Sequence, residues 1–211
     1  MVITVGSTKG GVGKSTIACN LAVESSLAGI KTLLVDADIQ GSSLSFRSTR
    51  ETDDIQATAI TTPTLHKDLK EFERVYGLIL IDAGGRESAV FRSAIVACDA
   101  LLIPVLPSQY DLWAANDTIK LLKEARAYRE IPAYFVINQV TNTKIAREAI
   151  EAMEGFSGDA ETLGSTLFTR TAYKSSIVLG KGVSEYEARG KAAREMRALY
   201  REITGKGEAW R

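Results

Sequence analysis

Residues 9–16 of this chain, Lys-Gly-Gly-Val-Gly-Lys-Ser-Thr, have the composition of a loop that binds phosphate. They follow the apolar run Val2–Val5, so a strand is expected to end in a glycine-rich turn that opens a helix. Glycines let the backbone approach an anion, and the amides at a helix start point towards it. Lys14 could then reach terminal phosphates, and the Ser15 hydroxyl could bind magnesium. Lys9 is an additional cation, and a nucleotide phosphate is the simplest group for it to neutralise.

Two further apolar runs end in carboxylates. Leu34-Val35 leads into Asp36 and Asp38, and the run 78–81 leads into Asp82. Asp82 has the setting of a Walker B acid, which holds the magnesium shell through water. A single aspartate after a strand also fits a turn or a helix cap, and Asp36 could equally shape its loop through hydrogen bonds. Three polar strand ends in succession nevertheless predict one shared site.

The elements that position these residues follow from the alternation of short apolar runs with longer amphipathic ones. Strands are expected at Val2–Ser7, Thr32–Asp36, Gln56–Ile60, Leu78–Asp82, Ala100–Val105 and Ala133–Gln139, and helices near 14–28, 65–75, 88–98, 111–129, 143–154, 172–180 and 187–204, with a loop at 155–159. Strands that are apolar at every position indicate a parallel sheet covered on both faces. The prediction is a doubly wound, mostly parallel α/β fold that gathers its ligands beyond the carboxyl ends of the strands.

The composition indicates one globular domain over residues 1–211. Of its residues, 45 % are hydrophobic and 25 % are charged, and no Pro/Gly/Ser-rich linker divides the chain. Lys plus Arg and Asp plus Glu both number 26, so a nucleic-acid surface would have to be a local patch. Cys19 and Cys98 lie among apolar residues and are expected to be buried thiols. The sequence has neither a leader pattern nor a run long enough to span a membrane, so a cytoplasmic location is expected.

The motifs together resemble those of one family. Residues 9–16, the segment Asp36-Ala37-Asp38-Ile39-Gln40-Gly41-Ser42 and the pair Ile81-Asp82 are similar to the deviant Walker A, Walker A′ and Walker B motifs of the ParA/MinD superfamily. The similarity spans roughly residues 1–140. Thr8 and the segment 40–42 are more like ParA partition ATPases than MinD. The short length and the lack of an N-terminal DNA-binding extension resemble the small ParA type, including ParF.

The resemblance implies ATP or ADP with Mg²⁺ as cofactors and assigns roles to the motif residues. The nucleotide would be bound by Lys9, Gly10, Gly11, Val12, Gly13, Lys14, Ser15 and Thr16. Ser15 would ligate magnesium, Asp82 would hold a magnesium-bound water, and Asp38 would orient or activate the attacking water. Lys9 would cross a dimer interface to the partner's nucleotide, where it would offset the repulsion between two triphosphates. Lys9, Lys14 and Asp38 are thus the expected catalytic residues.

The base of the nucleotide has a candidate ligand further along the chain. Asn138 ends the run 135–138, and an amide can both donate to and accept from an adenine edge. In the resembled family the matching asparagine contacts the base, although an asparagine at this point could instead cap a turn. Residues 106–111 resemble the family's base-side loop, with Asp111 as the expected cap of the following helix.

The last predicted helix, 187–204, has two faces. Ala192, Met196, Leu199 and Ile203 fall on one side, and Lys191, Arg194, Arg197 and Arg201 fall on another. A basic stripe could hold DNA phosphates without reading sequence, as ParA-type ATPases do, with Arg170 and Lys174 as further candidates. Glu187, Glu195 and Glu202 dilute the stripe, so an ordinary solvated face is equally compatible. Its apolar side is modest for a membrane-surface helix, and residues 205–208 are expected to end it.

The function expected from these features is that of a ParA-type partition ATPase. It would form a homodimer on ATP, bind DNA non-specifically at the nucleoid and position plasmid, chromosomal or other cargo through a centromere-binding or adaptor protein. Slow hydrolysis would reset it. The alternatives are a MinD-like membrane-associated ATPase and a small-molecule enzyme such as dethiobiotin synthetase. The nitrogenase iron-protein branch needs a cysteine soon after Walker B, and residues 86–88, Arg-Glu-Ser, offer none.

Overall fold

The computed structural model describes residues 1–84, 88–156 and 158–207, and a sheet of parallel strands runs through its centre. The strands are β1 (Val2–Val5), β2 (Thr32–Ala37), β3 (Ile55–Ala59), β4 (Leu78–Ala83), β5 (Ala100–Val105), β6 (Ala133–Val140) and β7 (Glu161–Phe168). Their order in the sheet is β3-β2-β4-β1-β5-β6-β7, and each neighbouring pair is parallel. The predicted doubly wound parallel α/β fold is confirmed.

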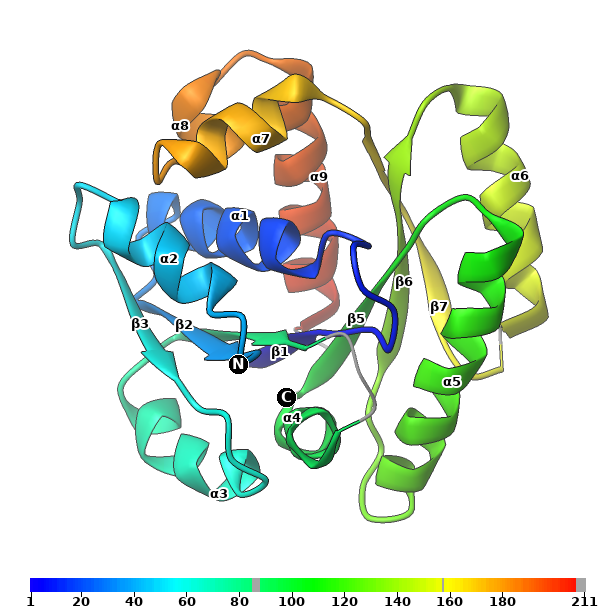
Figure 1. Cartoon of the computed structure of the whole chain (residues 1–211), viewed down its shortest axis with the longest axis horizontal. Helices are drawn as coiled ribbons and strands as arrows, with labels where there is room; N and C mark the ends of the chain where they lie inside the picture. Colours follow the sequence, from blue (N-terminus) through cyan, green and yellow to red (C-terminus); the bar gives the residue numbers. More distant parts are fainter. Residues whose placement is uncertain (85–87, 157, 208–211) are drawn as a thin grey trace.

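Helices cover both faces of this sheet, as fully apolar strands require. They are α1 (Lys14–Leu27), α2 (Ser42–Thr49), α3 (Leu65–Asp68), α4 (Ala89–Ala97), α5 (Gln109–Arg126), α6 (Thr143–Met153), α7 (Thr171–Val178), α8 (Val183–Tyr186) and α9 (Lys191–Lys206), with 3₁₀ turns η1 (Leu69–Arg74) and η2 (Glu154–Phe156). Figure 1 shows α1, α2, α7 and α9 on one side of the sheet and α3, α4 and α5 on the other. In β4, Leu78 and Leu80 join one apolar core while Ile79 and Ile81 join the other.

The register of the ladder brings the polar strand ends together. Asp82 in β4 lies opposite Val5 at the end of β1 on one side and opposite Asp36 in β2 on the other. The phosphate-loop candidate therefore begins beside both carboxylates, at the carboxyl end of the sheet, where this class of fold binds its ligands.

Three features of the fold differ from the sequence-based expectation. The predicted first strand includes Gly6 and Ser7, but β1 ends at Val5. Helix α2 was not predicted, because Ser43 and Phe46 are its buried residues and its sequence has no apolar period. Strand β7 was not predicted either: it is an edge strand with glycine and four hydroxyl or acidic residues, and Leu163 and Leu167 are its buried members.

The C-terminal helix also starts later than expected. It begins at Lys191 after the separate short helix α8, and it continues through Gly205 to Lys206, whereas the sequence indicated an end at 204. Glu208 and Trp210 lie outside the described residues. The predicted loop at 155–159 overlaps η2, and residue 157 is likewise outside the described part. Cys19 and Cys98 are buried as expected, and burial raises the pKa of both thiols.

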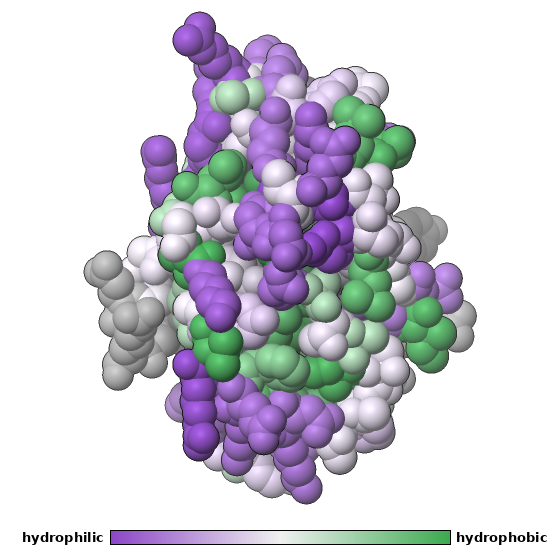
Figure 2. Space-filling view, turned by 90° about the vertical axis from the view of Figure 1, so that its left-hand side faces the viewer, coloured by the Kyte–Doolittle hydropathy of each residue, from purple (hydrophilic) through white to green (hydrophobic). Residues whose placement is uncertain are grey.

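The sheet ends at β3 on the side away from β7, and the surface over this edge is mostly hydrophilic. Figure 2 faces this edge and shows polar residues with smaller apolar groups between them. Among the residues described, no helix is long and apolar enough to cross a bilayer.

Helix α9 packs its apolar side into the core, and one acidic side chain of α1 is trapped beneath it. Ala192, Met196 and Leu199 are buried there. Glu24 is buried as well; it accepts a hydrogen bond from the hydroxyl of Ser184, to which Arg197 Nη1 also donates (3.1 Å). Burial raises the pKa of the Glu24 carboxyl, and the hydrogen bond from the Ser184 hydroxyl opposes the shift.

Replacing Glu24 by glutamine is therefore expected to raise the free energy of unfolding at neutral pH, by on the order of 1 kcal/mol. The raised pKa means that the protonated carboxyl stabilises the folded state. This contribution is complete below the pKa of an unfolded glutamate, ~4.3, and is lost as the pH rises through the raised pKa of the folded protein. Urea unfolding from about pH 4 to about pH 7 measures the difference between Glu24→Gln and wild type, which should grow with pH. A difference in the free energy of unfolding that shrinks with rising pH would contradict this prediction. Glu51→Gln is the matched control, because Glu51 is exposed.

Candidate functional site

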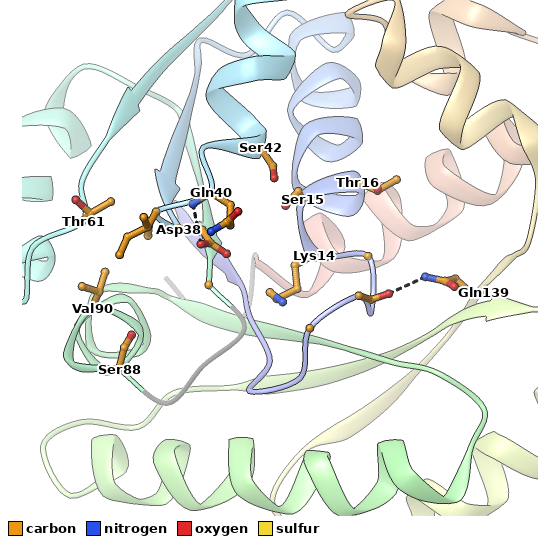
Figure 3. A pocket seen from close by; sticks show the side chains of 16 residues that line it. Lys14, Ser15, Thr16, Asp38, Gln40, Ser42, Thr61, Ser88, Val90 and Gln139 are labelled. Atoms are coloured by element: carbon orange, nitrogen blue, oxygen red, sulfur yellow. Dashed lines mark hydrogen bonds between the residues drawn. The ribbon is translucent and has the colours of Figure 1, made fainter.

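A cavity of about 800 Å³ opens at the carboxyl ends of β1, β2 and β4. Figure 3 shows its lining, which combines the glycine-rich loop, the segment after β2 and the start of α4. The lining residues include Gly10, Gly11, Gly13, Lys14, Ser15, Thr16, Asp38, Gln40, Ser42, Thr61, Ser88 and Gln139. Apart from Val12, whose side chain is buried, the predicted loop residues 10–16 thus face one hollow.

The loop turns sharply because two of its glycines adopt left-handed backbone conformations. Gly11 has φ +76° and Gly13 has φ +90°. At Gly13 a side chain is also excluded by space, because a Cβ atom would lie 2.4 Å from Nδ2 of Asn138. The turn delivers the chain into α1, whose first residue is Lys14.

Lys14 is the buried cation of this cavity. Its Nζ donates a hydrogen bond to the carbonyl oxygen of Lys9 (3.0 Å), which folds the side chain back over the loop. Burial lowers the pKa of the Lys14 ammonium, and the negative charges of Asp82 and Asp38 oppose the shift. Lys14 is thus placed among the carboxylates that the sequence analysis grouped with it.

Asp82 is buried at the end of β4 and is tied to the start of α2. Oδ2 of Asp82 accepts a hydrogen bond from the hydroxyl of Ser43 (2.7 Å). Burial raises the pKa of Asp82 to about 6, while hydrogen bonds from the hydroxyls of Ser15 and Ser43 oppose the shift. Sequence reasoning paired Asp82 with Ser15 but missed Ser43, because it predicted no helix there.

The two aspartates after β2 have different surroundings. Asp36 is buried and accepts hydrogen bonds from the backbone N–H groups of Asp38 (3.1 Å) and Leu44 (3.0 Å). These hydrogen bonds shape the loop, which is one of the two roles that the sequence left open for Asp36. Asp38 lines the cavity, and in the described part of the chain its carboxylate accepts from the N–H of Gln40 (3.0 Å) and faces the hollow (Figure 3). Ile39 follows Asp38, and its side chain is 89 % exposed.

Lys9 lies at the front of the loop and contacts α5 of its own chain. Its Nζ is 2.7 Å from Oδ2 of Asp111, a buried carboxylate whose Oδ1 has no hydrogen-bond partner among the described residues. Asp111 is not the helix cap that was predicted: Ser108 caps α5 and accepts from the N–H of Asp111 (3.3 Å). The hydroxyl of Thr8 also bonds α5, at the carbonyl of Ala114 (3.1 Å). Helix α5 therefore anchors the front of the loop.

Asn138 holds the loop from the other side. Its Nδ2 donates to the carbonyl oxygen of Val12 (2.8 Å), and its Oδ1 accepts from the N–H of Gln139 (2.8 Å). Both polar atoms of the amide are thus engaged, and the contact of Asn138 with a base stays a prediction.

A second, smaller cavity of about 150 Å³ adjoins the first. It shares Gly13, Thr16 and Gln139 with the larger cavity and is otherwise formed by α1, Asn138 and the connection from β7 to α7. Arg170 and Lys174, which the sequence grouped with a basic patch, line this hollow, and Arg170 pairs with Glu195. Residues 106–108 of the predicted base-side loop line a different hollow, against α6. The β7–α7 connection was missed because β7 itself was missed.

The basic residues of α9 divide into two groups. Lys191, Arg194 and Arg201 are exposed, whereas Arg197 is half-buried and donates to the carbonyl of Ala188 (2.8 Å). Two of the three acidic residues that seemed to dilute the stripe are directed to β7: Glu195 accepts from the N–H of Phe168, and Glu202 from the N–H groups of Gly164 and Ser165. The third, Glu187, precedes α9 at the end of α8.

Comparisons with known proteins agree with this geometry. The CobQ/CobB/MinD/ParA nucleotide binding domain matches residues 3–183. The Maintenance of carboxysome distribution protein A of Gloeobacter kilaueensis is 31 % identical (96 % of this chain, 91 % of that protein), and that of Halothiobacillus neapolitanus is 29 % identical (95 % of each chain). The septum site-determining protein MinD of Pyrococcus horikoshii, solved with Mg-ADP, shares the fold with a TM-score of 0.81 at 17 % identity, over the whole of this chain (100 %) and 98 % of its own. This chain therefore belongs to the CobQ/CobB/MinD/ParA family of nucleotide-binding domains.

Proposed function

We propose that this protein is a ParA-type ATPase that pairs on ATP, binds DNA in the paired state and positions a large cargo. The observation that carries the proposal is the gathering of three charged groups at the carboxyl end of the sheet: Lys14 and Asp38 line one cavity, and the charge of the buried Asp82 acts on Lys14. The cavity has the volume of a nucleotide-sized site, and the smaller cavity beside it offers room for the base. Gly10–Thr16 would hold the phosphates, with Asn138 near the base.

The donor set of the cavity fits magnesium. Mg²⁺ prefers hard oxygen ligands and keeps several of its waters, and here the Ser15 hydroxyl hydrogen-bonds the buried Asp82 carboxylate, which also interacts with the charge of Lys14. Ser15 would bind the ion directly and Asp82 would hold one of its waters. When bound, the ion neutralises charge that develops on the phosphates.

Hydrolysis would turn ATP and water into ADP and phosphate. Asp38, whose carboxylate faces the cavity, would orient the attacking water and accept its proton. Lys14 would stabilise the charge on the terminal phosphates. Lys9 would leave Asp111 and reach the nucleotide of a second copy, so that the complete site forms only in a homodimer.

The exposed cations of α9 support a DNA-binding role for this helix. Lys191, Arg194 and Arg201 have no ion-pair partner in the described part of the chain, and Glu195 and Glu202 are committed to β7. Such a stripe would bind phosphates without reading sequence and would place the protein on the nucleoid. Arg197 is assigned to the fold, since it bonds Ser184 and Ala188.

The names of the relatives suggest the kind of cargo. Two of them are proteins for the distribution of carboxysomes, which are large assemblies. We therefore include a large protein assembly, beside plasmid or chromosomal DNA, among the cargoes that an adaptor or centromere-binding protein would connect to this chain. A MinD-like membrane role is less well supported, because the apolar side of α9 is buried in the core.

Sedimentation with DNA tests the proposal. Wild-type protein mixed with non-specific duplex DNA should pellet with it about tenfold better with ATP than with ADP, which is within the usual range of coupling between two sites. Binding should fall steeply as salt rises. Pelleting with liposomes instead of DNA would contradict the proposal and favour the membrane alternative.

Charge reversals on α9 locate the DNA contact. Arg194→Glu combined with Lys191→Glu should abolish sedimentation with DNA but leave ATP hydrolysis intact. Lys120→Glu combined with Lys123→Glu is the matched control, because both are exposed lysines on α5, on the opposite face of the sheet, and their reversal changes the net charge equally. Equal losses in both variants would show that net charge, and not the α9 stripe, governs the interaction.

A further inference from the structure

The end of β6 carries two neighbouring amide side chains that both grip the glycine-rich loop. Nδ2 of Asn138 donates to the carbonyl of Val12 (2.8 Å), and Nε2 of Gln139 donates to the carbonyl of Gly11 (3.1 Å). The second of these bonds is the dashed line at the right of Figure 3. Gln139 also borders both the larger and the smaller cavity. Two successive peptide groups of the loop are thus held from outside the loop.

Holding a carbonyl fixes the direction of the N–H in the same peptide group. The peptide unit is planar, and no described bond is cis, so the C=O and the N–H point to opposite sides. With the Gly11 carbonyl turned towards Gln139, the N–H of Val12 points away from Gln139. With the Val12 carbonyl turned towards Asn138, the N–H of Gly13 points away from Asn138. These are the donors that a loop of this kind offers to a phosphate.

The backbone of Gln139 is strained in this position. Its φ is +54°, and it is the one non-glycine residue with positive φ in residues 1–84, 88–156 and 158–207. A side chain there is disfavoured, and glycine would relieve the strain. The conformation is held from both sides, because Oδ1 of Asn138 accepts from the N–H of Gln139 and the hydroxyl of Thr169 donates to its carbonyl (2.9 Å). A residue with an amide side chain thus occupies a position that glycine would occupy more easily.

We propose that Gln139 is a positioning residue of the phosphate loop: its amide orients the Gly11–Val12 peptide so that the N–H of Val12 faces the phosphates of the nucleotide. The proposal rests on the nucleotide-binding function proposed above. Gln139 acts through the loop backbone and needs no contact with the nucleotide itself.

Two substitutions separate the amide from the strain. Gln139→Met keeps the length of the side chain and the strained backbone but removes the donor, and Gln139→Gly removes the donor and relieves the strain. Both should weaken the affinity for ADP about three- to tenfold, the range expected for one hydrogen bond. The Gly variant without nucleotide should be at least as stable to urea as the Met variant.

The comparison of ADP with AMP identifies the phosphate as the group affected. AMP lacks the β-phosphate of ADP, which the oriented N–H groups of the loop would bind. The affinity for AMP, measured by competition for the site, should therefore change less than twofold in either variant. Gln56→Met is the matched control, since Gln56 is an exposed glutamine on β3 whose amide bonds Asp53. Wild-type protein provides the reference for the whole experiment.

The outcomes are distinguishable. If wild-type protein binds ADP and Gln139→Met binds it as tightly as Gln56→Met does, the positioning role is wrong while the proposed function stands. If the affinities for AMP and for ADP fall by the same factor, Gln139 acts on the base side or on the fold, and the proposal is likewise overturned. If wild-type protein does not bind ADP, the proposed function itself fails.

Discussion

Replacing Lys9 by alanine is expected to abolish ATP-dependent pairing and to lower ATP hydrolysis by a factor of about 100 or more. In a face-to-face dimer two triphosphates repel each other, and a lysine from each copy would offset that repulsion in a site that excludes water. Lys9 is held by Asp111 at 2.7 Å, yet its side chain is 32 % exposed, so it is accessible to a second copy. Affinity for ADP should change little, because Lys14 and not Lys9 would hold the phosphates within one chain.

Light scattering coupled to gel filtration, with ATP and with ADP, measures the pairing. Lys120→Ala removes an exposed lysine of α5 that pairs with the exposed Asp117, and it should behave as wild type. Asp38→Ala serves as the complementary control: it should still pair on ATP while hydrolysis is lost. A Lys9→Ala protein that dimerises with ATP and hydrolyses it at the wild-type rate would rule out the role across the interface.

The second large effect is expected at Arg50, where alanine should lower the free energy of unfolding by about 2–4 kcal/mol. The guanidinium is buried and makes two-pronged pairs with both neighbouring carboxylates: Asp54 at 2.7 and 2.8 Å, and Glu185 at 2.6 and 2.8 Å. It also donates to the carbonyl of Gly180 (3.0 Å). Removing it takes the neutralising cation from two carboxylates, although Asp54 still accepts from the hydroxyls of Ser26 and Thr52 and Glu185 from the N–H of Gly182. This loss lies at the low end for buried ion pairs because water reaches both carboxylates, which are partly exposed.

Urea unfolding followed by circular dichroism measures this loss. Arg47→Ala is the matched control, in the helix that ends directly before Arg50: Arg47 pairs with Asp53, which is 81 % exposed, and such surface pairs contribute about 0–1 kcal/mol. The hydrogen bond from Arg50 holds the pKa of Asp54 well below its usual range. The stability from this pair is therefore present above the pKa of an unfolded aspartate and is lost as the pH falls. A loss no larger than that of Arg47→Ala would contradict the expected role of Arg50.

The sequence predicted the sheet well where strands are apolar on both sides. In β4 and β5 each residue is buried, and the expected bounds agree to within one residue. It failed at β7 and α2, whose residues are partly polar and take their structure from neighbouring elements. Strand β7 lies at an edge beside β6, and α2 is fixed by Ser43 on Asp82 and by Leu44 on Asp36. Local patterns do not carry such information.

The same distinction applies to the site. Lys14, Asp38 and Asp82 could be grouped from the sequence because each follows a recognisable strand. The partners of the loop could not, because Asp111 and Gln139 are about a hundred residues or more from the groups they hold and reach them only through the fold. No periodic pattern marks a carboxylate that binds Lys9 or an amide that binds a carbonyl.

The strand order has a consequence for how the chain comes to be folded. β1 is synthesised first but lies between β4 and β5, which begin at Leu78 and Ala100. At typical rates of translation, about 5–20 residues per second, this apolar strand waits on the order of several seconds before either neighbour exists. Parallel pairing between such distant segments is also intrinsically slow. The segment that leads into the phosphate loop is therefore the one that most needs protection, by a chaperone or by the ribosome itself, while the protein is being made.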